Sequence, residues 1–353
     1  MKKTKIKLLA NICLGVVCTA LFALLLVFVI SGYLSEVLKI VISSLVGLLV
    51  VFLLNSILHE LGHLAVGLAC GLEFYKVKFL GLTVSKSKNG LKLGFDKSSK
   101  ELGETILNPK GTDKVLQKYV LSACGGLGAT LLIMVAQVLI CLLCNSLLVY
   151  CSLGITFPLT VYFFMINFLP VFENNDGYLI YKYLSGGEER VIIDNYFKAV
   201  SSLYSGVEPC DLDSSLLVRY DGINGYSVNI RYLRYLAYVK SDEERALKEL
   251  REISDLSEIS SLNDEIFEEL FFNALLLNDK KFIKLHEAEA VAVFENAVRP
   301  QTYRVHASYR IWSGEKDWAK LILKSGIEFC KSYAVKGIAK SEEKYMKILL
   351  NNL

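Results

Sequence analysis

The chain has 353 residues, of which 53% are hydrophobic, 39 are Lys or Arg and 36 are Asp or Glu. This apolar content exceeds the ~45–50% of soluble domains, and the net charge of +3, without a basic–aromatic stripe, argues against a nucleic-acid-binding protein. Residues 1–186 carry 16 Lys/Arg against 9 Asp/Glu, and residues 187–353 carry 23 against 27. The sequence therefore predicts an apolar membrane domain followed by a charged soluble one.

The N-terminal residues are typical of a transmembrane helix. Four of the first seven residues are Lys, and residues 8–35 then contain no charged side chain. Such a stretch can cross about 30 Å of hydrocarbon, and it is longer than the ~7–15-residue core of a secretory signal peptide. We therefore expect an uncleaved helix within residues 1–36. The leading Lys residues place its N-terminus in the cytoplasm.

A second apolar span, residues 37–70, contains the pattern H-E-x-x-H. Residues 40–58 carry no charge, and His59, Glu60 and His63 follow. On a helix the two His project from one face, where their imidazoles can bind one Zn²⁺, and the Glu can take a proton from a metal-bound water. Ionisable groups are costly in a membrane helix and therefore indicate function. The pattern predicts a membrane zinc enzyme.

Residues 72–118 form a loop with ten Lys and five acidic residues, which is typical of the cytoplasmic side. Phe74–Ser85 and Leu91–Phe95 alternate in polarity on either side of Lys88-Asn89-Gly90, and Asn-Gly is a hairpin turn signal. We therefore expect a small β-hairpin insert within residues 72–114. Its exposed edge could receive an extended peptide strand, or it could be only a solvated basic surface.

Residues 119–172 contain no charge, which is too long for one span and suits two, with an external turn near residues 144–146. The small residues at 123–129 favour close helix packing, and a backbone contribution to the site is an open alternative. Cys141 and Cys144 lie at membrane depth and without a second pair, so we interpret them as small hydrophobic residues.

The last apolar span ends in the stretch 167–178, N-F-L-P-V-F-E-N-N-D-G-Y. Two His leave Zn²⁺ short of protein ligands, and Asp176 lies at the same depth as the H-E-x-x-H pair. Pro170 interrupts the helix. Irregular backbone at membrane depth is tolerated only where it is buried in protein or lines a cavity. Alone, the stretch could be a cap and turn, but beside the His pair a ligand role is favoured. Glu173 could compete as a ligand.

These residues together resemble the site-2 protease family of intramembrane zinc metalloproteases. The resemblance rests on H-E-x-x-H at 59–63, on Asn167-x-x-Pro170, and on the later Asp176-Gly177. It covers about residues 37–185, and it implies a core of three helices with the His pair on the first and Asp-Gly on the third.

The resemblance implies a role for each matching residue. His59, His63 and Asp176 would hold zinc, Glu60 would be the general base, and Asn167 would help to position an unwound substrate strand.

The chain also departs from the family's pattern. The glycines at 125–128 match the middle helix only loosely because the usual Pro and Asn are missing, and residues 173–175 make the approach to Asp176 wetter than usual. The sequence has no recognisable PDZ-like or paired nucleotide-binding regulatory region. The Asp-Gly-Tyr ending resembles smaller family members found beside peptide-export or pheromone systems.

The charged C-terminal half is typical of helical hairpins. Polar turns near Lys240, Asn278 and Gly314 are spaced by 38 and 36 residues, close to the ~34-residue period of tetratricopeptide repeats. The repeat's signature residues are mostly absent, so we predict a tetratricopeptide-like array that binds a protein or peptide, or a bundle that only stabilises the enzyme. His286 and His306 are isolated, and we expect no metal at either.

We therefore expect an all-α membrane protein with about four transmembrane helices, a small cytoplasmic β-hairpin and a soluble α-helical domain. Its parts would be an N-terminal helix (1–36), a metalloprotease core (37–185) and a cytoplasmic helical domain (186–353). We expect an integral, multi-pass protein of a bacterial cell membrane, with both termini in the cytoplasm.

The predicted function is zinc-dependent hydrolysis of peptide bonds in membrane-anchored polypeptides, as in regulated intramembrane proteolysis or pheromone maturation. Zn²⁺ is the expected cofactor, and the bilayer and a membrane-anchored substrate are the expected partners. The alternative is a catalytically silent membrane scaffold or immunity protein whose helical domain binds a partner.

Overall fold

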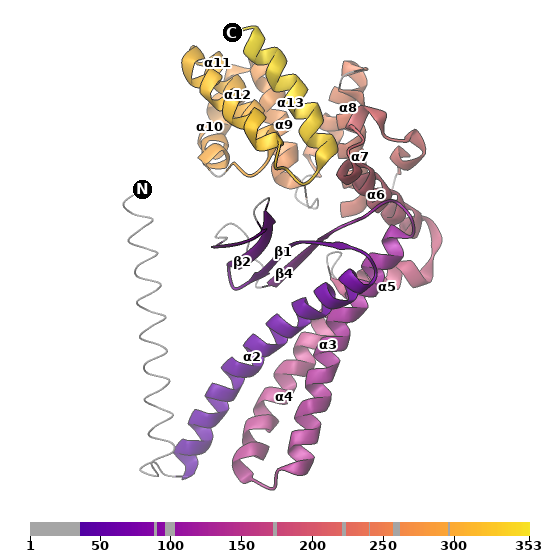
Figure 1. The fold of residues 1–353 in the computed structure, drawn as a ribbon, viewed down its shortest axis with the longest axis vertical. Coiled ribbons are helices and arrows are strands. Elements are labelled where there is room, and N and C mark those ends of the chain that lie inside the picture. Colours follow the sequence, from indigo (N-terminus) through magenta and orange to yellow (C-terminus); the bar gives the residue numbers. More distant parts are fainter. Residues whose placement is uncertain are drawn as a thin grey trace. The chain divides into compact units, whose positions relative to one another are not determined.

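The computed structural model describes residues 36–87, 90–95, 103–171, 175–220, 224–239, 241–256, 262–295 and 297–353 (Figure 1). The described chain is mostly helical, with twelve α-helices and one four-stranded antiparallel sheet. The helix expected within residues 1–36 lies outside the described residues, apart from Glu36.

Three of the helices are long and apolar enough to cross a membrane. They are α2 (Glu36–Ala69), α3 (Val115–Leu143) and α4 (Leu147–Phe168). These helices confirm the expected second to fourth spans, and α3 and α4 are separated at residues 144–146, where the sequence predicts a turn. The protein is therefore a membrane protein.

The chain divides into two compact units. One comprises the chain up to Gly62, described from Glu36, together with Gly126–Phe168. The other comprises His63–Gly125 and Leu169–Leu353. Helices α2 and α3 each run without a break from one unit into the other.

Buried polar side chains join the helices of the first unit. Asn55 is fully buried, and its Nδ2 donates both to the Val51 carbonyl of α2, at 2.9 Å, and to Thr160 Oγ1 of α4, at 3.1 Å. Gln137 Nε2 of α3 donates to Thr156 Oγ1 of α4 at 3.4 Å. Without a hydrophobic force between helices in lipid, such hydrogen bonds help to hold the helices together.

The segment predicted as one hairpin forms a four-stranded antiparallel sheet, so the expected hairpin is confirmed only as one part of a larger insert. The strands are β1 (Glu73–Phe79), β2 (Leu82–Ser87), β3 (Gly90–Phe95) and β4 (Gly103–Asn108), in the spatial order β3-β2-β1-β4. The expected hairpin is present as β2–β3, with Ser87 opposite Gly90, and β3 and β4 are the edge strands.

The run Phe74–Ser85 is two strands because a turn interrupts it. Phe79 pairs with Leu82, and the two residues between them, Leu80 and Gly81, have φ of +48° and +86°. Positive φ at both positions is the requirement of the tight turn that matches strand twist. Leu rarely adopts this conformation, so the sequence gives only a weak signal for it.

The sheet packs against the parts of α2 and α3 that belong to the same unit. Tyr119 Oη of α3 donates to the Leu107 carbonyl of β4 at 2.6 Å. A Cβ at Gly67 would lie 2.2 Å from the Leu107 side chain and 3.1 Å from Ser122 Oγ, so a larger residue there would require the Leu107 side chain to move. This contact fixes the sheet one helical turn beyond His63.

Helices α5 (Asp176–Ser185) and α6 (Gly187–Ser205) follow the last membrane helix and meet at Gly186, which has φ of +71°. Tyr178 of α5 packs with Leu116 and Val120 of α3 and with Ile193 of α6 in one buried cluster. The start of α5 is therefore anchored to α3.

The C-terminal helical domain (α6–α13) contains the predicted helical hairpins. Its remaining helices are α7 (Gly225–Tyr238), α8 (Glu243–Ser254), α9 (Asn263–Leu276), α10 (Lys280–Glu295), α11 (Pro300–Trp312), α12 (Lys316–Cys330) and α13 (Lys336–Asn351), with short 3-10 turns at Pro209–Asp211 and Ser214–Leu217. Helices α7 and α8, α9 and α10, and α11 and α12 pack as pairs, and α13 packs on α12, α11 and α6 (Figure 1).

Two of the predicted turns have the same backbone geometry. Asn278 and Gly314 have φ of +53° and +84°. The next amide in each turn donates back to a carbonyl five residues earlier, Asp279 to Ala274 and Glu315 to Arg310. This is a helix C-cap that needs a left-handed residue, which Gly and Asn provide most readily. The likeness to tetratricopeptide repeats stays a prediction.

Candidate metal centre

His63 is oriented by the backbone of α3. Its Nδ1 lies 2.9 Å from the Ser122 carbonyl oxygen, and a carbonyl can only accept, so Nδ1 carries the proton. Ser122 Oγ in turn donates to the His63 carbonyl at 2.9 Å. The two helices are thus linked twice at this point, and Nε2 is the ring nitrogen left to bind a metal.

His59 is oriented by a side chain of α3. It is buried, and its Nδ1 lies 3.1 Å from Oγ1 of the fully buried Thr130. The Thr130 hydroxyl donates its only proton to the Gly126 carbonyl at 3.3 Å, so it accepts from His59 Nδ1–H. By the same argument, Nε2 is the nitrogen through which His59 would bind a metal.

Asp176 is the first residue of α5, and its neighbour Asn175 positions it. The Asn175 side chain accepts from the Tyr178 amide at 2.8 Å, which caps the helix, and its Nδ2 donates to the Leu169 carbonyl beyond the end of α4. A capped N-terminus stabilises an anionic side chain in the first turn. The cap and turn considered from the sequence is therefore present, and it presents a carboxylate.

The Asp176 carboxylate faces His63. Oδ2 lies 3.3 Å from His63 Nε2, and both side chains are mostly buried. With Nδ1 protonated, Nε2 and the carboxylate oxygen both offer lone pairs, so a proton or a metal cation must lie between them. Two ligands of tetrahedral zinc at bonds of about 2.0–2.1 Å would be about 3.3–3.4 Å apart, which fits this separation.

The three predicted ligands form one group. One turn of the continuous helix α2 separates His59 from His63, and a direct contact joins His63 to Asp176. Their ligand atoms all lie within 4.8 Å of one another. Among the described residues this is the only group of three or more His, Cys, Asp or Glu side chains suited to a metal.

The other predicted site residues are less defined. Glu60 is half-buried and follows His59 by about 100° around α2. Asn167 Nδ2 donates to the Phe163 carbonyl of its own helix at 3.0 Å, so a substrate-positioning role stays a prediction. Glu173, the alternative ligand, lies outside the described residues.

The structure adds two residues that the sequence did not single out, Ser122 and Thr130. Each orients one His from α3, 59 and 71 residues along the chain. A backbone contribution is an open alternative for the small-residue segment 123–129, but the carbonyl that contacts His63 belongs to Ser122, which lies just before this segment. The sequence cannot indicate that a backbone carbonyl has this role, because every residue has one. A Thr in an apolar helix gives only a weak indication.

Comparison with known proteins gives no relative: no family model, no curated protein and no solved structure matches this chain.

Proposed function

We propose that this protein is an intramembrane zinc-dependent endopeptidase that cleaves membrane-anchored polypeptide segments near the cytoplasmic side of the bilayer. The observation that carries the proposal is the His63–Asp176 pair, in which two acceptor atoms face each other one helical turn from His59. The motifs shared with the site-2 protease family add independent support.

The donor set suits catalytic zinc. Two imidazole nitrogens and one carboxylate oxygen leave the fourth tetrahedral position for water or substrate, whereas structural zinc sites use four protein ligands. Each imidazole has its other nitrogen hydrogen-bonded to α3, which is the usual support of metal-binding His. When bound, the metal would supply Lewis acidity, which lowers the pKa of water and polarises a carbonyl.

The protein's own residues would then handle protons and position the substrate. Glu60, beside His59, would accept a proton from the attacking water and return it to the leaving amine. A substrate segment must first unwind, because the carbonyls of a helix are hydrogen-bonded within it. Asn167 would hold the extended strand through its side-chain amide.

The deciding experiment compares purified wild type with Glu60→Gln in detergent. Zinc content is measured by metal analysis, and cleavage is measured on a panel of membrane-anchored peptides with helix-breaking residues. We expect equal zinc in both proteins and a fall in cleavage of about 10²–10⁴-fold in the variant. Glu104→Gln, in β4 and paired with Lys76, is the control and should cleave normally.

Folded wild type without zinc would refute the enzyme and favour the scaffold alternative. Cleavage that survives Glu60→Gln would refute the assigned base.

A further inference from the structure

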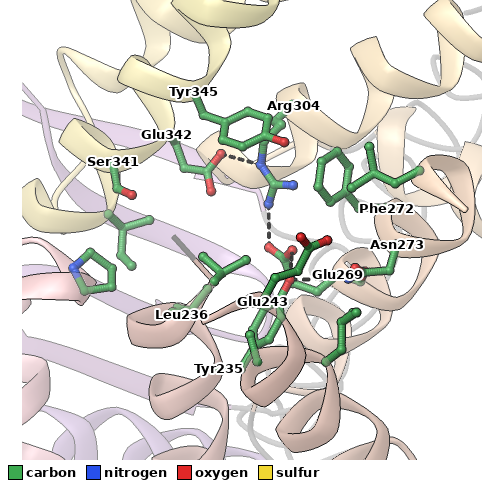
Figure 2. A pocket seen from close by; sticks show the side chains of 16 residues that line it. Tyr235, Leu236, Glu243, Glu269, Phe272, Asn273, Arg304, Ser341, Glu342 and Tyr345 are labelled. Atoms are coloured by element: carbon green, nitrogen blue, oxygen red, sulfur yellow. Dashed lines mark hydrogen bonds and ion pairs between the residues drawn. The ribbon is translucent and has the colours of Figure 1, made fainter. Parts of the chain in front are cut away.

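The C-terminal helical domain contains a cavity of about 220 Å³ between α7, α8, α9, α11 and α13. A water molecule occupies about 30 Å³ of liquid, so the cavity can hold a group of several heavy atoms. Figure 2 shows Arg304 at its centre, between the carboxylates of Glu342 and Glu269. The exposed side chain of Glu243 also lines it.

The charges that line this cavity are not balanced. Among the described residues that line the cavity, Arg304 is the only cationic side chain, against the three carboxylates of Glu243, Glu269 and Glu342. Glu269 accepts from Arg304 and also from Tyr235 Oη at 2.8 Å, so both of its oxygens are used. A second positive charge would compensate the excess.

Glu342 provides the atom that such a charge would meet. Its residue is only 8% exposed, and Oε2 accepts from Arg304 Nε at 2.7 Å. Among the described residues Oε1 has no hydrogen-bond partner, yet it is not sealed from solvent. Burial raises the pKa of this carboxyl more than Arg304 lowers it, as expected where a buried carboxylate is incompletely compensated.

The cavity offers apolar side chains near the solvent. Leu276 and Val239 line it and are 58% and 38% exposed, whereas Arg304 and Glu342 are buried. The chain of an occupant can therefore lie against Leu276 and Val239 while its end reaches Glu342. The rings of Phe272 and Tyr345 also line the cavity, and both already lie near the Arg304 guanidinium, whose Cζ is 4.2 Å and 5.5 Å from their centroids.

We propose that this cavity binds a protonated amine at the end of an aliphatic or peptide chain, supplied by a lysine side chain or a free N-terminus of a polypeptide. The ammonium group donates to Glu342 Oε1, and the chain attached to it lies against Leu276 and Val239. This site goes beyond the proposed protease activity and does not depend on it.

The test uses the full-length Glu60→Gln protein in detergent, so that no peptide is cleaved. Calorimetric titration compares three probes: Ac-AAKAA-NH₂, AAAA-NH₂ with a free amine, and Ac-AA-norleucine-AA-NH₂. We expect the first or second probe to bind and norleucine not to bind, and the amine that binds identifies the source.

Glu342→Gln and Glu243→Gln should each weaken binding, the first by about tenfold or more, the loss expected for a charge-assisted hydrogen bond. Glu343→Gln, the next residue of α13 and paired with Lys347, is the matched control and should bind as before. Because Glu243 is exposed, its variant should fold even if Glu342→Gln does not. Failure of both amines to bind, or affinity unchanged in Glu243→Gln and in folded Glu342→Gln, would overturn the proposal.

Discussion

His63 in membrane helix α2 and His306 in the C-terminal helical domain are both held by hydrogen bonds, but in different ways. His306 stacks on Phe294 with ring centroids 4.6 Å apart, and Arg310 Nε donates to its Nε2 at 3.2 Å, so that its lone pair is used. His63 donates from Nδ1, and its Nε2 faces the Asp176 carboxylate. A His is therefore a ligand candidate where its remaining lone pair faces another acceptor.

The same contrast separates the acidic residues of the two regions. In the helical domain, Glu268 accepts from Arg299 and Thr302, and Glu249 accepts from Arg234. Such pairs join helices through an Arg, although Oε2 of Glu268 and of Glu249 has no hydrogen-bond partner among the described residues. In the membrane region the carboxylate of Asp176 instead meets an imidazole, and a proton or a metal cation is required between the two acceptor atoms. The predictions below test this difference.

The largest expected effect is on the stability of the helical domain. Arg304→Met leaves Glu269 and Glu342 without their buried cation, which should lower the free energy of unfolding by about 3–5 kcal/mol. Both Trp residues of the chain, Trp312 and Trp318, lie in this domain, so urea unfolding followed by Trp fluorescence reports on it alone. Arg310→Met, at a partly exposed pair, should cost less than about 1 kcal/mol. Equal losses of unfolding free energy in Arg304→Met and Arg310→Met would contradict the distinction between buried and exposed ion pairs.

Removal of the Asp176 carboxylate should act on the metal instead. Asp176→Asn removes the carboxylate of one of the three proposed ligands. Zinc affinity should fall by more than about 100-fold, because losing a group that only supports a ligand already costs up to about 100-fold. Competition with a chelator measures the affinity, and the Trp-monitored unfolding should not change. Asp194→Asn, paired with Lys198 on α6, is the control and should keep full affinity. Zinc bound equally by both variants would exclude Asp176 as a ligand.

Thr130 should have a smaller effect on the same property. Thr130→Val removes the acceptor of His59 Nδ1–H, and we expect zinc affinity to fall by about 10–100-fold. Thr130→Ser retains the hydroxyl and should stay close to wild type. A valine variant with wild-type affinity would show that this hydrogen bond does not orient the imidazole.

The smallest effect is a pH dependence caused by His306. Burial and Arg310 lower the pKa of His306 from 6.5 to about 4. The unfolded chain then binds the proton more readily, so stability is lost as the pH falls from about 6.5 toward 4. After allowance for solvent screening, we expect this loss of unfolding free energy to be roughly 1–2 kcal/mol. The difference in unfolding free energy between wild type and His306→Gln, measured by Trp fluorescence, should shrink or reverse from pH 7.5 to pH 5. A difference that stays constant over this range would contradict the prediction.

The features that could be predicted from the sequence are local ones. Charge-free runs of defined length gave α2, α3 and α4, and a left-handed Asn or Gly marked the turns at Asn278 and Gly314. The His pair follows from helical spacing alone. Asp176 needed the additional argument of matching depth, which the 3.3 Å contact with His63 supports.

The features that could not be predicted depend on distant or unusual backbone. The run Phe74–Ser85 forms two strands because Leu80 adopts a left-handed conformation that its side chain disfavours, and β4 pairs with β1 from a separate segment. The Ser122 carbonyl acts on His63 from 59 residues away, and no residue type encodes a carbonyl. The cavity around Arg304 gathers side chains from five helices, and sequence periodicity does not locate such a group.

The hydrogen-bond partners of the two imidazoles differ in how easily a mutation can remove them. The partner of His63 is a main-chain oxygen, which persists whatever side chain occupies position 122. The partner of His59 is the hydroxyl of Thr130, which a single nucleotide change in its codon can delete. If such a centre decays in a descendant lineage, we expect the loss to begin at the His59 side, with position 130 diverging while H-E-x-x-H is still intact.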